Sequence, residues 1–222
     1  MGTIYAIANQ KGGVGKTTTA VNTAACVAAE GDQVLLVDLD QQCNATVALD
    51  RPKDSEPNVY ECLSGDLTLD QAARPTAIDG LGPVRDRFSL TLLDCPPSLG
   101  PVTVNALVAA DRVIVPVQTE YFALEGLAGL LDTLALVQRE LNPRLTVAGM
   151  LLTMHDARTK LAQDVEAEVR RHFPSLVFDT VIPRNVRLGE APSFGVPVIH
   201  HDPHCAGSDA YFELAKEVAA RG

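Results

Sequence analysis

Long hydrophobic runs, paired cysteines and an excess of basic residues are all absent from this chain of 222 residues. Its longest apolar runs, residues 34–37 and 113–117 among them, are far shorter than the roughly 20 residues that a membrane-spanning helix needs. Residues 1–10 lack both the basic start and the long apolar centre of a signal peptide. We therefore expect no membrane span and a cytoplasmic location.

The cysteine content and the charge argue against two further kinds of protein. Five cysteines are spread along the chain without a CxxC pair, so the sequence indicates neither a zinc site nor a redox centre. Reduced thiols are the simplest interpretation. The formal net charge of −10 argues against a protein that binds nucleic acid over its whole surface, because phosphate binding requires a local excess of Lys and Arg. Any contact with DNA must therefore be local.

The arrangement of apolar segments predicts an α/β fold. A composition of 46% hydrophobic and 21% charged residues suits one globular domain, which we expect to span residues 1–222. Near-continuous apolar runs, typical of strands buried on both faces, occupy residues 3–9, 33–40, 90–95, 112–118, 146–154 and 177–183. Apolar residues at helical spacing occupy residues 17–30, 124–141, 160–173 and 209–220. This alternation predicts a mostly parallel sheet with helices on both faces.

A glycine-rich turn follows the first expected strand and leads directly into a helix. It reads Gln10-Lys11-Gly12-Gly13-Val14-Gly15-Lys16-Thr17-Thr18. Glycines let the backbone approach phosphates with its N–H groups, and the helix N-terminus adds the positive end of its dipole. Lys16 is expected to reach the β- and γ-phosphates, Thr17 to bind Mg²⁺, and Thr18 to contact the α-phosphate. The stretch from Lys11 to Thr18 therefore predicts a P-loop NTPase that binds ATP with Mg²⁺; the alternative is a glycine-rich turn with a surface lysine.

The loop departs from the general pattern GxxxxGK[ST] in two ways. Gln10 replaces the first glycine, and a second lysine stands at position 11. This variant, KGGVGKT, resembles the deviant Walker A box of the ParA and MinD group of ATPases. The resemblance implies that Lys11 reaches across a nucleotide-sandwich dimer to the phosphates of the other subunit, so that ATP binding and dimerisation are one event. The alternative is that Lys11 is only solvated.

Carboxylates at the ends of two strands are expected around the phosphates. Asp38 and Asp40 close the second expected strand, where alternation puts them on the same side. By the resemblance, Asp40 activates the attacking water and Asp38 supports the Mg²⁺ shell, while the alternative for each is a helix N-cap or a surface acid. Asp94 ends the third strand and resembles a Walker B residue that binds Mg²⁺ through water. Gln41 and Cys43 replace a proline and a glycine that are usual in the family, which puts the loop geometry in question.

The second half of the chain resembles the Soj, or chromosomal, branch of ParA at residues 152–159 and 182–195. The resemblance implies that Met154, Pro183 and Asn185 lie around the adenine, and that Arg184 and Arg187 lie near a DNA-binding face. Two arginines three positions apart give only a weak, salt-sensitive contact with phosphates, and a dimer doubles it. The alternative is that both arginines only form salt bridges.

Two stretches differ from that branch. Ala206 stands in a segment that often carries arginine, so one expected DNA contact is missing. Residues 51–89 are rich in proline and charge and are expected to form a surface excursion. The stretch between Tyr60 and Asp94 is also shorter than is usual in the family, which suggests the loss of one strand of the sheet.

These features predict a DNA-partitioning ATPase. The resemblance implies that ATP drives dimerisation, that the dimer binds double-stranded DNA without sequence preference, and that a ParB-like activator stimulates hydrolysis in chromosome or plasmid segregation. Lys11, Lys16 and Asp40 are expected to carry out the hydrolysis, and the nucleoid is the expected cellular location.

Three alternatives use the same scaffold. The first is a ParA-like ATPase that positions a protein cargo, and the sequence does not separate it from the leading interpretation. The second is a MinD-like ATPase that cycles on membranes, but the last expected helix carries Glu213, Lys216 and Glu217 and is unsuited to an anionic membrane. The third is an enzyme that modifies a small molecule, but no additional substrate-binding domain is evident.

Overall fold

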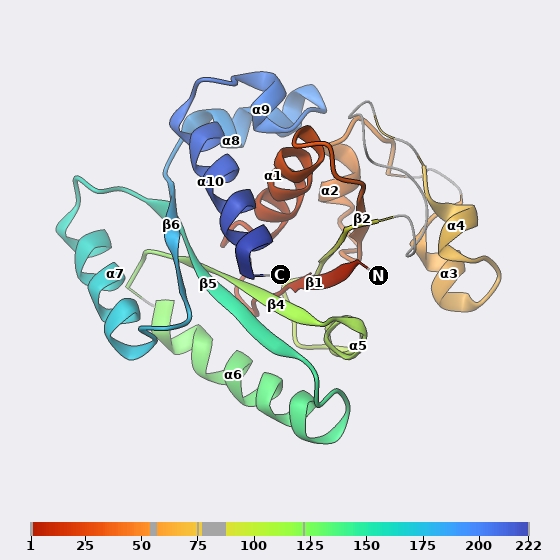
Figure 1. Cartoon of the computed structure of the whole chain (residues 1–222), viewed down its shortest axis with the longest axis horizontal. Helices are drawn as coiled ribbons and strands as arrows, with labels where there is room; N and C mark the ends of the chain where they lie inside the picture. The colour runs from red at the N-terminus through yellow and green to blue at the C-terminus, as the bar shows by residue number, and fades with distance from the viewer. Residues whose placement is uncertain (1, 54–56, 75, 77–87, 122, 222) are drawn as a thin grey trace.

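A parallel β-sheet forms the centre of the molecule (Figure 1). The computed structural model describes residues 2–53, 57–74, 76, 88–121 and 123–221. Within these residues the strands are β1 (Thr3–Ile7), β2 (Val34–Asp38), β3 (Leu90–Asp94), β4 (Arg112–Gln118), β5 (Thr146–His155) and β6 (Val177–Pro183). Their order across the sheet is β2-β3-β1-β4-β5-β6, and each neighbouring pair is parallel.

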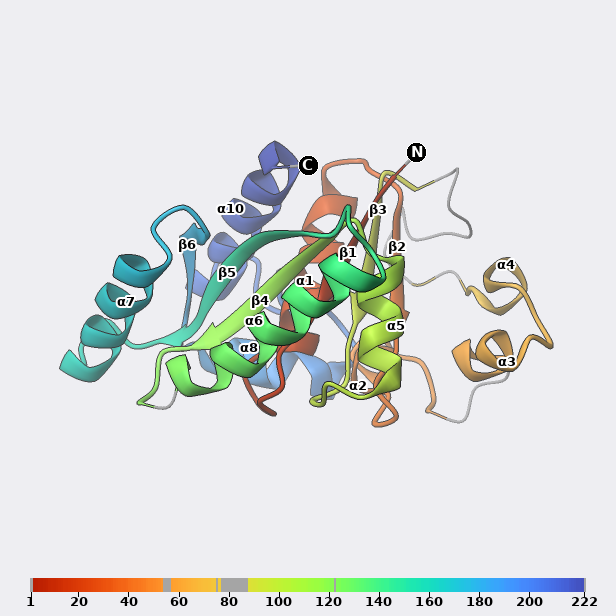
Figure 2. The ribbon, with the colours of Figure 1, turned by 90° about the horizontal axis from the view of Figure 1, so that it is seen from below.

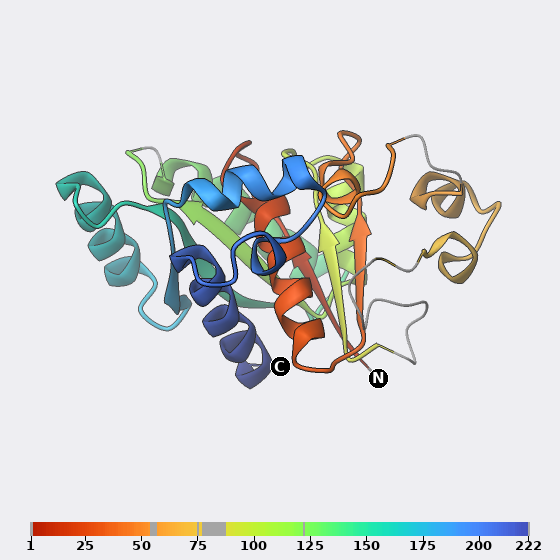
Figure 3. The same ribbon diagram turned by 90° about the horizontal axis from the view of Figure 1, so that it is seen from above.

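Helices cover both faces of this sheet. One face carries α1 (Lys16–Ala29) and α10 (Ala206–Arg221), with α8 (Val186–Glu190), the 3-10 helix η1 (Ala191–Phe194) and α9 (Val198–His201) beside them (Figure 3). The other face carries α5 (Pro101–Ala109), α6 (Ala123–Glu140) and α7 (Lys160–His172) (Figure 2). The short α2 (Asn44–Val47) follows β2. In the part of the chain that the structure describes, no helix is both long and apolar enough to cross a membrane.

Burial on both faces explains the near-continuous apolar sequences of the strands. Along β1, Tyr5 and Ile7 belong to the core that includes α1 and α10. Ile4, Ala6 and the following Ala8 belong to the core that includes α5 and α6. Successive side chains of a strand point to opposite faces, so a strand with both faces covered must be apolar throughout.

The strand register positions the residues that matter for function. Asp94 at the end of β3 lies opposite Ile7 at the end of β1 and opposite Asp38 at the end of β2. The chain that leaves β1 towards α1 therefore starts at the same edge of the sheet as both carboxylates. In parallel sheets this edge, at the carboxyl ends of the strands, is where ligands bind.

The expected strands and helices are confirmed, with differences at their ends. The strand expected at residues 33–40 ends already at Asp38, because the Asp38 carboxylate accepts the backbone N–H of Asp40 and turns the chain. The last helix, expected at residues 209–220, begins earlier, at Ala206.

Residues 57–74, the described central part of the stretch expected as a surface excursion, lie beyond the β2 edge of the sheet (Figures 1 and 3). They contain two short helices, α3 (Val59–Ser64) and α4 (Leu69–Ala72), which lie next to each other at the periphery (Figures 1 and 3). Their apolar side chains Tyr60, Leu63 and Leu69 are exposed. Residues 54–56, 75 and 77–87 lie outside the described residues, and the expected loss of a strand falls partly on them.

Candidate functional site

The predicted phosphate loop forms a tight turn between β1 and α1. Gly13 and Gly15 have φ angles of 74° and 88°, in the left-handed region that other residues rarely adopt. Gly15 is also the N-cap of α1, so Lys16 is the first residue of the helix. The first N–H groups of a helix have no partners within it and favour an anion. The loop therefore has the backbone geometry that a phosphate group requires.

Lys16 lies buried in this loop. Its exposed fraction is 7%, and its Nζ donates to the backbone oxygen of Lys11 at 3.2 Å. Burial lowers the pKa of the ammonium group, and the negative charges of Asp94 and Asp40 oppose this change. A buried ammonium requires hydrogen-bond acceptors, and phosphate oxygens supply strong ones.

Side chains from the neighbouring strands hold the loop. The hydroxyl of Thr153, in β5, donates to the backbone oxygen of Val14 at 2.9 Å. Asn9 accepts the backbone N–H of Lys11 at 3.0 Å, and its amide donates to the oxygen of Pro116 in β4 at 2.7 Å. The loop is therefore fixed to the sheet on the side of β4 and β5. Sequence reasoning missed Thr153 and Asn9 because the contacts of Thr153 with Val14 and of Asn9 with Pro116 join distant parts of the chain.

Asp94 is a fully buried carboxylate beside the loop. Its exposed fraction is 0%, and neither of its oxygens has a hydrogen-bond partner within the described residues. Burial raises the pKa of Asp94 to about 7; the nearby Thr17 hydroxyl and Lys16 lower it, and Asp38 and Asp40 raise it. A buried carboxylate without partners is unfavourable unless a ligand or ion completes its surroundings.

The two carboxylates after β2 have different contacts. Asp38 accepts the N–H of Asp40 at 3.2 Å, and the N–H and hydroxyl of Thr46 at 2.9 and 2.8 Å. Because Thr46 lies in α2, Asp38 fixes this short helix against the end of β2. Asp40 lies beyond the strand, and its Oδ1 accepts the N–H of Gln42 at 3.0 Å. Strand alternation therefore does not apply to Asp40, although both carboxylates are near enough to Asp94 to raise its pKa.

Cys43, the N-cap residue of α2, has a left-handed backbone with φ of 53°. A side chain in this region costs about 1 kcal/mol or more. We expect Cys43→Gly to raise the free energy of unfolding by about 0.5–1 kcal/mol, because relief of this strain exceeds the added entropy of the unfolded chain. Denaturant unfolding measures the change.

The control is Cys43→Ala, which removes the thiol but keeps the Cβ atom. It should give no gain in stability. Equal stabilisation by alanine and glycine would assign the effect to the thiol and contradict backbone strain at this position.

A pocket of about 190 Å³ adjoins the loop and joins segments that are distant in sequence. The three residues expected around the adenine, Met154, Pro183 and Asn185, all line it. The remaining lining residues are Gly15, Thr18, Thr153, Ile182, Arg184, Leu188, Gly189 and Tyr211. Sequence reasoning missed Tyr211, which reaches the pocket from α10 and whose hydroxyl lies 3.4 Å from that of Thr19 in α1.

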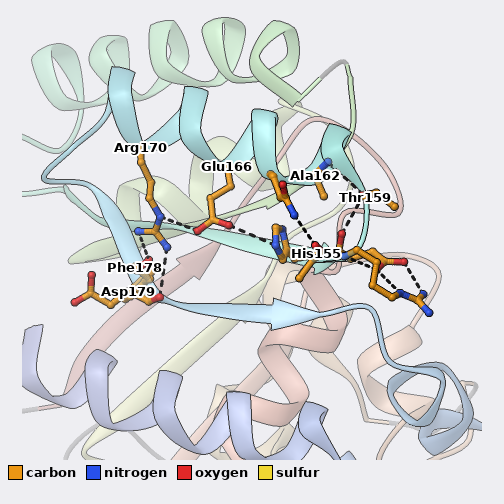
Figure 4. Close-up of polar contacts among 11 residues, drawn as sticks. His155, Thr159, Ala162, Glu166, Arg170, Phe178 and Asp179 are labelled. Carbon is orange, nitrogen blue, oxygen red and sulfur yellow. Dashed lines mark hydrogen bonds and ion pairs between the residues drawn. The ribbon is translucent and has the colours of Figure 1, made fainter.

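The strand that carries Met154 is fixed by a polar network (Figure 4). Met154 has a φ angle of 51°, a strained conformation of the kind that gathers at functional sites. The next residue, His155, places its Nε2 3.4 Å from Glu166 of α7. Glu166 also accepts from Arg170 at 2.9 Å, and Arg170 donates to the backbone oxygens of Phe178 and Asp179 in β6. This network ties α7 to both strands that end at the pocket.

The arginines expected at a DNA-binding face form ion pairs. Arg187 Nη1 lies 2.7 Å from Glu190 Oε2, and its Nε lies 3.2 Å from Asp202 Oδ2. Arg184 Nη2 lies 3.6 Å from Glu120 Oε1, and the same carboxylate lies 3.8 Å from the Nζ of Lys11. All these side chains are partly exposed, so the pairs are weak and open to competition by another anion.

The donor set at this edge suits Mg²⁺ bound together with phosphates. No group of three or more His, Cys, Asp or Glu side chains able to hold a metal by themselves occurs in the described ranges. Mg²⁺ is usually held by one or two carboxylates together with waters and phosphate oxygens. Asp94, which is orphaned and buried next to Thr17, fits that mode of binding.

Comparisons with known proteins agree with this geometry. Residues 5–198 match the model of the CobQ/CobB/MinD/ParA nucleotide binding domain. The chain is 52% identical to the chromosome-partitioning ATPase Soj of Thermus thermophilus over an alignment of 240 positions, which covers 97% of this chain and 95% of the relative. It is 47% identical to the sporulation initiation inhibitor protein Soj of Bacillus subtilis over an alignment of 253 positions, which covers all of both chains.

A solved structure extends the comparison to bound ligands. Cobyrinic acid a,c-diamide synthase from Mycobacterium smegmatis, with a bound ATP analogue and magnesium, has a TM-score of 0.84 and 34% identity, and the match covers 97% of this chain and 93% of that one. The fold, the loop and the two relatives together show that the chain belongs to the CobQ/CobB/MinD/ParA nucleotide-binding family and, within it, to the chromosome-partitioning ATPases of the Soj and ParA type.

Proposed function

We propose that this protein is an ATP-driven switch that binds Mg·ATP, dimerises, binds DNA and is reset by hydrolysis. The observation that carries the proposal is the fully buried Asp94, without a hydrogen-bond partner in the described chain, beside the buried ammonium of Lys16 and the left-handed glycines of the loop. This combination is unfavourable in an empty site and favourable around a magnesium nucleotide.

Residues of the loop and the adjoining pocket hold the nucleotide. The backbone from Lys11 to Thr18 surrounds the phosphates, with Lys16 directed to the β- and γ-phosphates and Thr18 to the α-phosphate. Met154, Pro183 and Asn185 line the pocket proposed for the adenine. Gly12, Gly13, Val14 and Gly15 contribute backbone contacts.

The three carboxylates have different roles in hydrolysis. Thr17 and Asp94 hold Mg²⁺, which when bound neutralises charge on the phosphates. Asp38 supports this site indirectly, since its oxygens already accept the N–H groups of Asp40 and of Thr46 in α2. Asp40 orients the attacking water and accepts its proton. Positioning of this kind supplies most of the catalysis in phosphoryl transfer.

Dimerisation uses Lys11. In the structure its ammonium lies 3.8 Å from Glu120, a partly exposed pair that is weak enough to separate at little cost. In the proposed dimer Lys11 instead reaches the phosphates bound to the partner subunit. ATP thereby stabilises the dimer, because each nucleotide contacts both subunits.

The dimer joins two weak DNA-binding faces. Arg184 and Arg187 of each subunit contact phosphates of double-stranded DNA without reading its sequence, and two linked faces bind more tightly than one. A ParB-like activator stimulates hydrolysis and returns the protein to monomers. The nucleoid is then the place of action, and segregation of chromosomal or plasmid DNA is the process.

Removal of the Asp40 carboxylate tests this cycle. We expect Asp40→Ala to bind ATP, to accumulate as a dimer and to lose turnover by at least about a hundredfold, because only water activation is removed. Sedimentation velocity with ATP and release of inorganic phosphate measure the two properties.

The control variant is Asp40→Asn, which keeps an acceptor for the Gln42 N–H but is no base. It should behave like Asp40→Ala. Normal turnover by either variant contradicts the role of Asp40, and loss of turnover in the alanine variant alone would assign Asp40 to loop structure instead.

A further inference from the structure

Arg187 is held by carboxylates of its own chain on the face proposed to meet DNA. Glu190 lies 2.7 Å from its Nη1, and Asp202 lies 3.2 Å from its Nε. The side chain of Arg187 is 48% exposed, so it can reach an external ligand. One cation faces two carboxylates, and the three groups together carry a net negative charge.

Further contacts keep both carboxylates in place. The backbone oxygen of Asp202 accepts the hydroxyl of Ser208 at 2.6 Å, which fixes the turn between α9 and α10. Glu190 Oε2 also lies 3.5 Å from Nε2 of His201, whose ring stacks on Phe194 with the centroids 4.8 Å apart. Asp202 Oδ1 also accepts the backbone N–H of His204 at 3.3 Å. Both carboxylates therefore lie on ordered segments, and an anion that approaches Arg187 meets their negative charge.

We propose that Glu190 and Asp202 are internal competitors that occupy Arg187 and lower the affinity of each subunit for DNA phosphates. This inference rests on the proposed function. A phosphate that binds Arg187 must either displace a carboxylate or bind the remaining N–H groups of the guanidinium beside both carboxylates, and in each case the negative charge that stays there repels the strand. Arg187 therefore contributes little in a monomer.

The two carboxylates make DNA binding depend more strongly on dimerisation. When each face alone binds very weakly, only a dimer that engages both faces at once stays on DNA. The competitor carboxylates thus restrict DNA binding to the ATP-bound dimer.

Asp202→Asn tests the inference directly. The substitution removes one negative charge and keeps an acceptor for the N–H of His204. In the dimer held by a slowly hydrolysed ATP analogue, we expect a labelled duplex of arbitrary sequence to bind about fivefold to thirtyfold more tightly, since an exposed ion pair is removed in both subunits. The affinity should also fall more steeply with salt. Fluorescence anisotropy at several salt concentrations measures both properties, and Glu190→Gln should act in the same direction.

The control is Asp32→Asn, which changes the net charge equally. Asp32 is exposed in the turn before β2. This turn lies at the amino ends of the strands, whereas the phosphate loop lies at their carboxyl ends. The Asp32→Asn substitution should change duplex affinity by less than about twofold, because a distant surface charge is screened.

The outcomes separate the inference from the function on which it rests. Wild-type dimer that binds DNA with the affinity of Asp202→Asn contradicts the inference alone, as does an equal gain from Asp32→Asn. Absence of duplex binding by both the wild-type and the Asp202→Asn dimers contradicts the proposed function and the inference together. Binding that is weak in the wild type and stronger in Asp202→Asn supports both.

Discussion

Lys16→Ala protein is expected to bind ATP at least about a hundredfold more weakly than the wild type. Lys16 is a buried cation whose ammonium has one backbone acceptor in the loop. In the proposed complex it makes charge-assisted hydrogen bonds to two phosphates, and the loss of two such bonds amounts to about 3 kcal/mol or more. Isothermal titration calorimetry with ATP and Mg²⁺ measures the change.

Lys11→Ala is the matched control, because it removes the same kind of side chain from the same loop. Lys11 is partly exposed and pairs with Glu120. The Lys11→Ala protein should therefore bind ATP nearly as well as the wild type but sediment as a monomer. A Lys16→Ala protein that still binds ATP tightly contradicts the assignment of Lys16, and a normal ATP-dependent dimer of Lys11→Ala contradicts the contact between subunits.

The substitution Asp94→Asn should lower ATPase activity and raise the stability of the nucleotide-free protein. Asp94 is fully buried without a hydrogen-bond partner in the described residues, and burial raises its pKa to about 7. Asp94→Asn should abolish turnover that depends on Mg²⁺. In nucleotide-free protein with EDTA, the same substitution should raise the free energy of unfolding by about 2–4 kcal/mol at about pH 8, because the buried charge is removed.

The stability difference between Asp94→Asn and the wild type should depend on pH. Burial places the pKa of Asp94 in the folded protein, about 7, above its value of about 4 in the unfolded chain. The stability that the neutral carboxyl group contributes is therefore complete below about pH 4, falls as the pH rises from about 4 to about 7, and changes little above that. The advantage of Asp94→Asn over the wild type in urea unfolding should accordingly grow from about pH 4 to about pH 7 and level off by about pH 8. A difference that stays constant or shrinks between about pH 4 and about pH 7 would contradict a buried, uncompensated Asp94.

The sequence predicts the sheet well because its signals are local. Buried parallel strands need apolar residues on both faces, and the runs around Ile7, Leu92 and Ile114 show this directly. The phosphate loop is likewise encoded in adjacent residues, so Gly13, Gly15 and Lys16 could be placed before the structure was known.

Contacts between distant segments could not be predicted in this way. Thr153 reaches the loop from β5 and Tyr211 reaches the pocket from α10, and neither belongs to a recognisable pattern. Asp38 and Asp40 were expected to share a strand, but hydrogen bonds to Thr46 decide where Asp38 points. Pairing of Arg187 with Asp202 depends on the turn after α9, which the sequence alone does not position.

The central claim is that ATP makes this protein a DNA-binding dimer. The most direct measurement is the anisotropy of a labelled, non-specific duplex titrated with wild-type protein and ATP, ADP or no nucleotide, at two salt concentrations. We predict binding with ATP alone, and weaker binding at the higher salt concentration, since the contacts are to phosphates. A dimer that forms with ATP but leaves the duplex unbound at both salt concentrations would contradict the account.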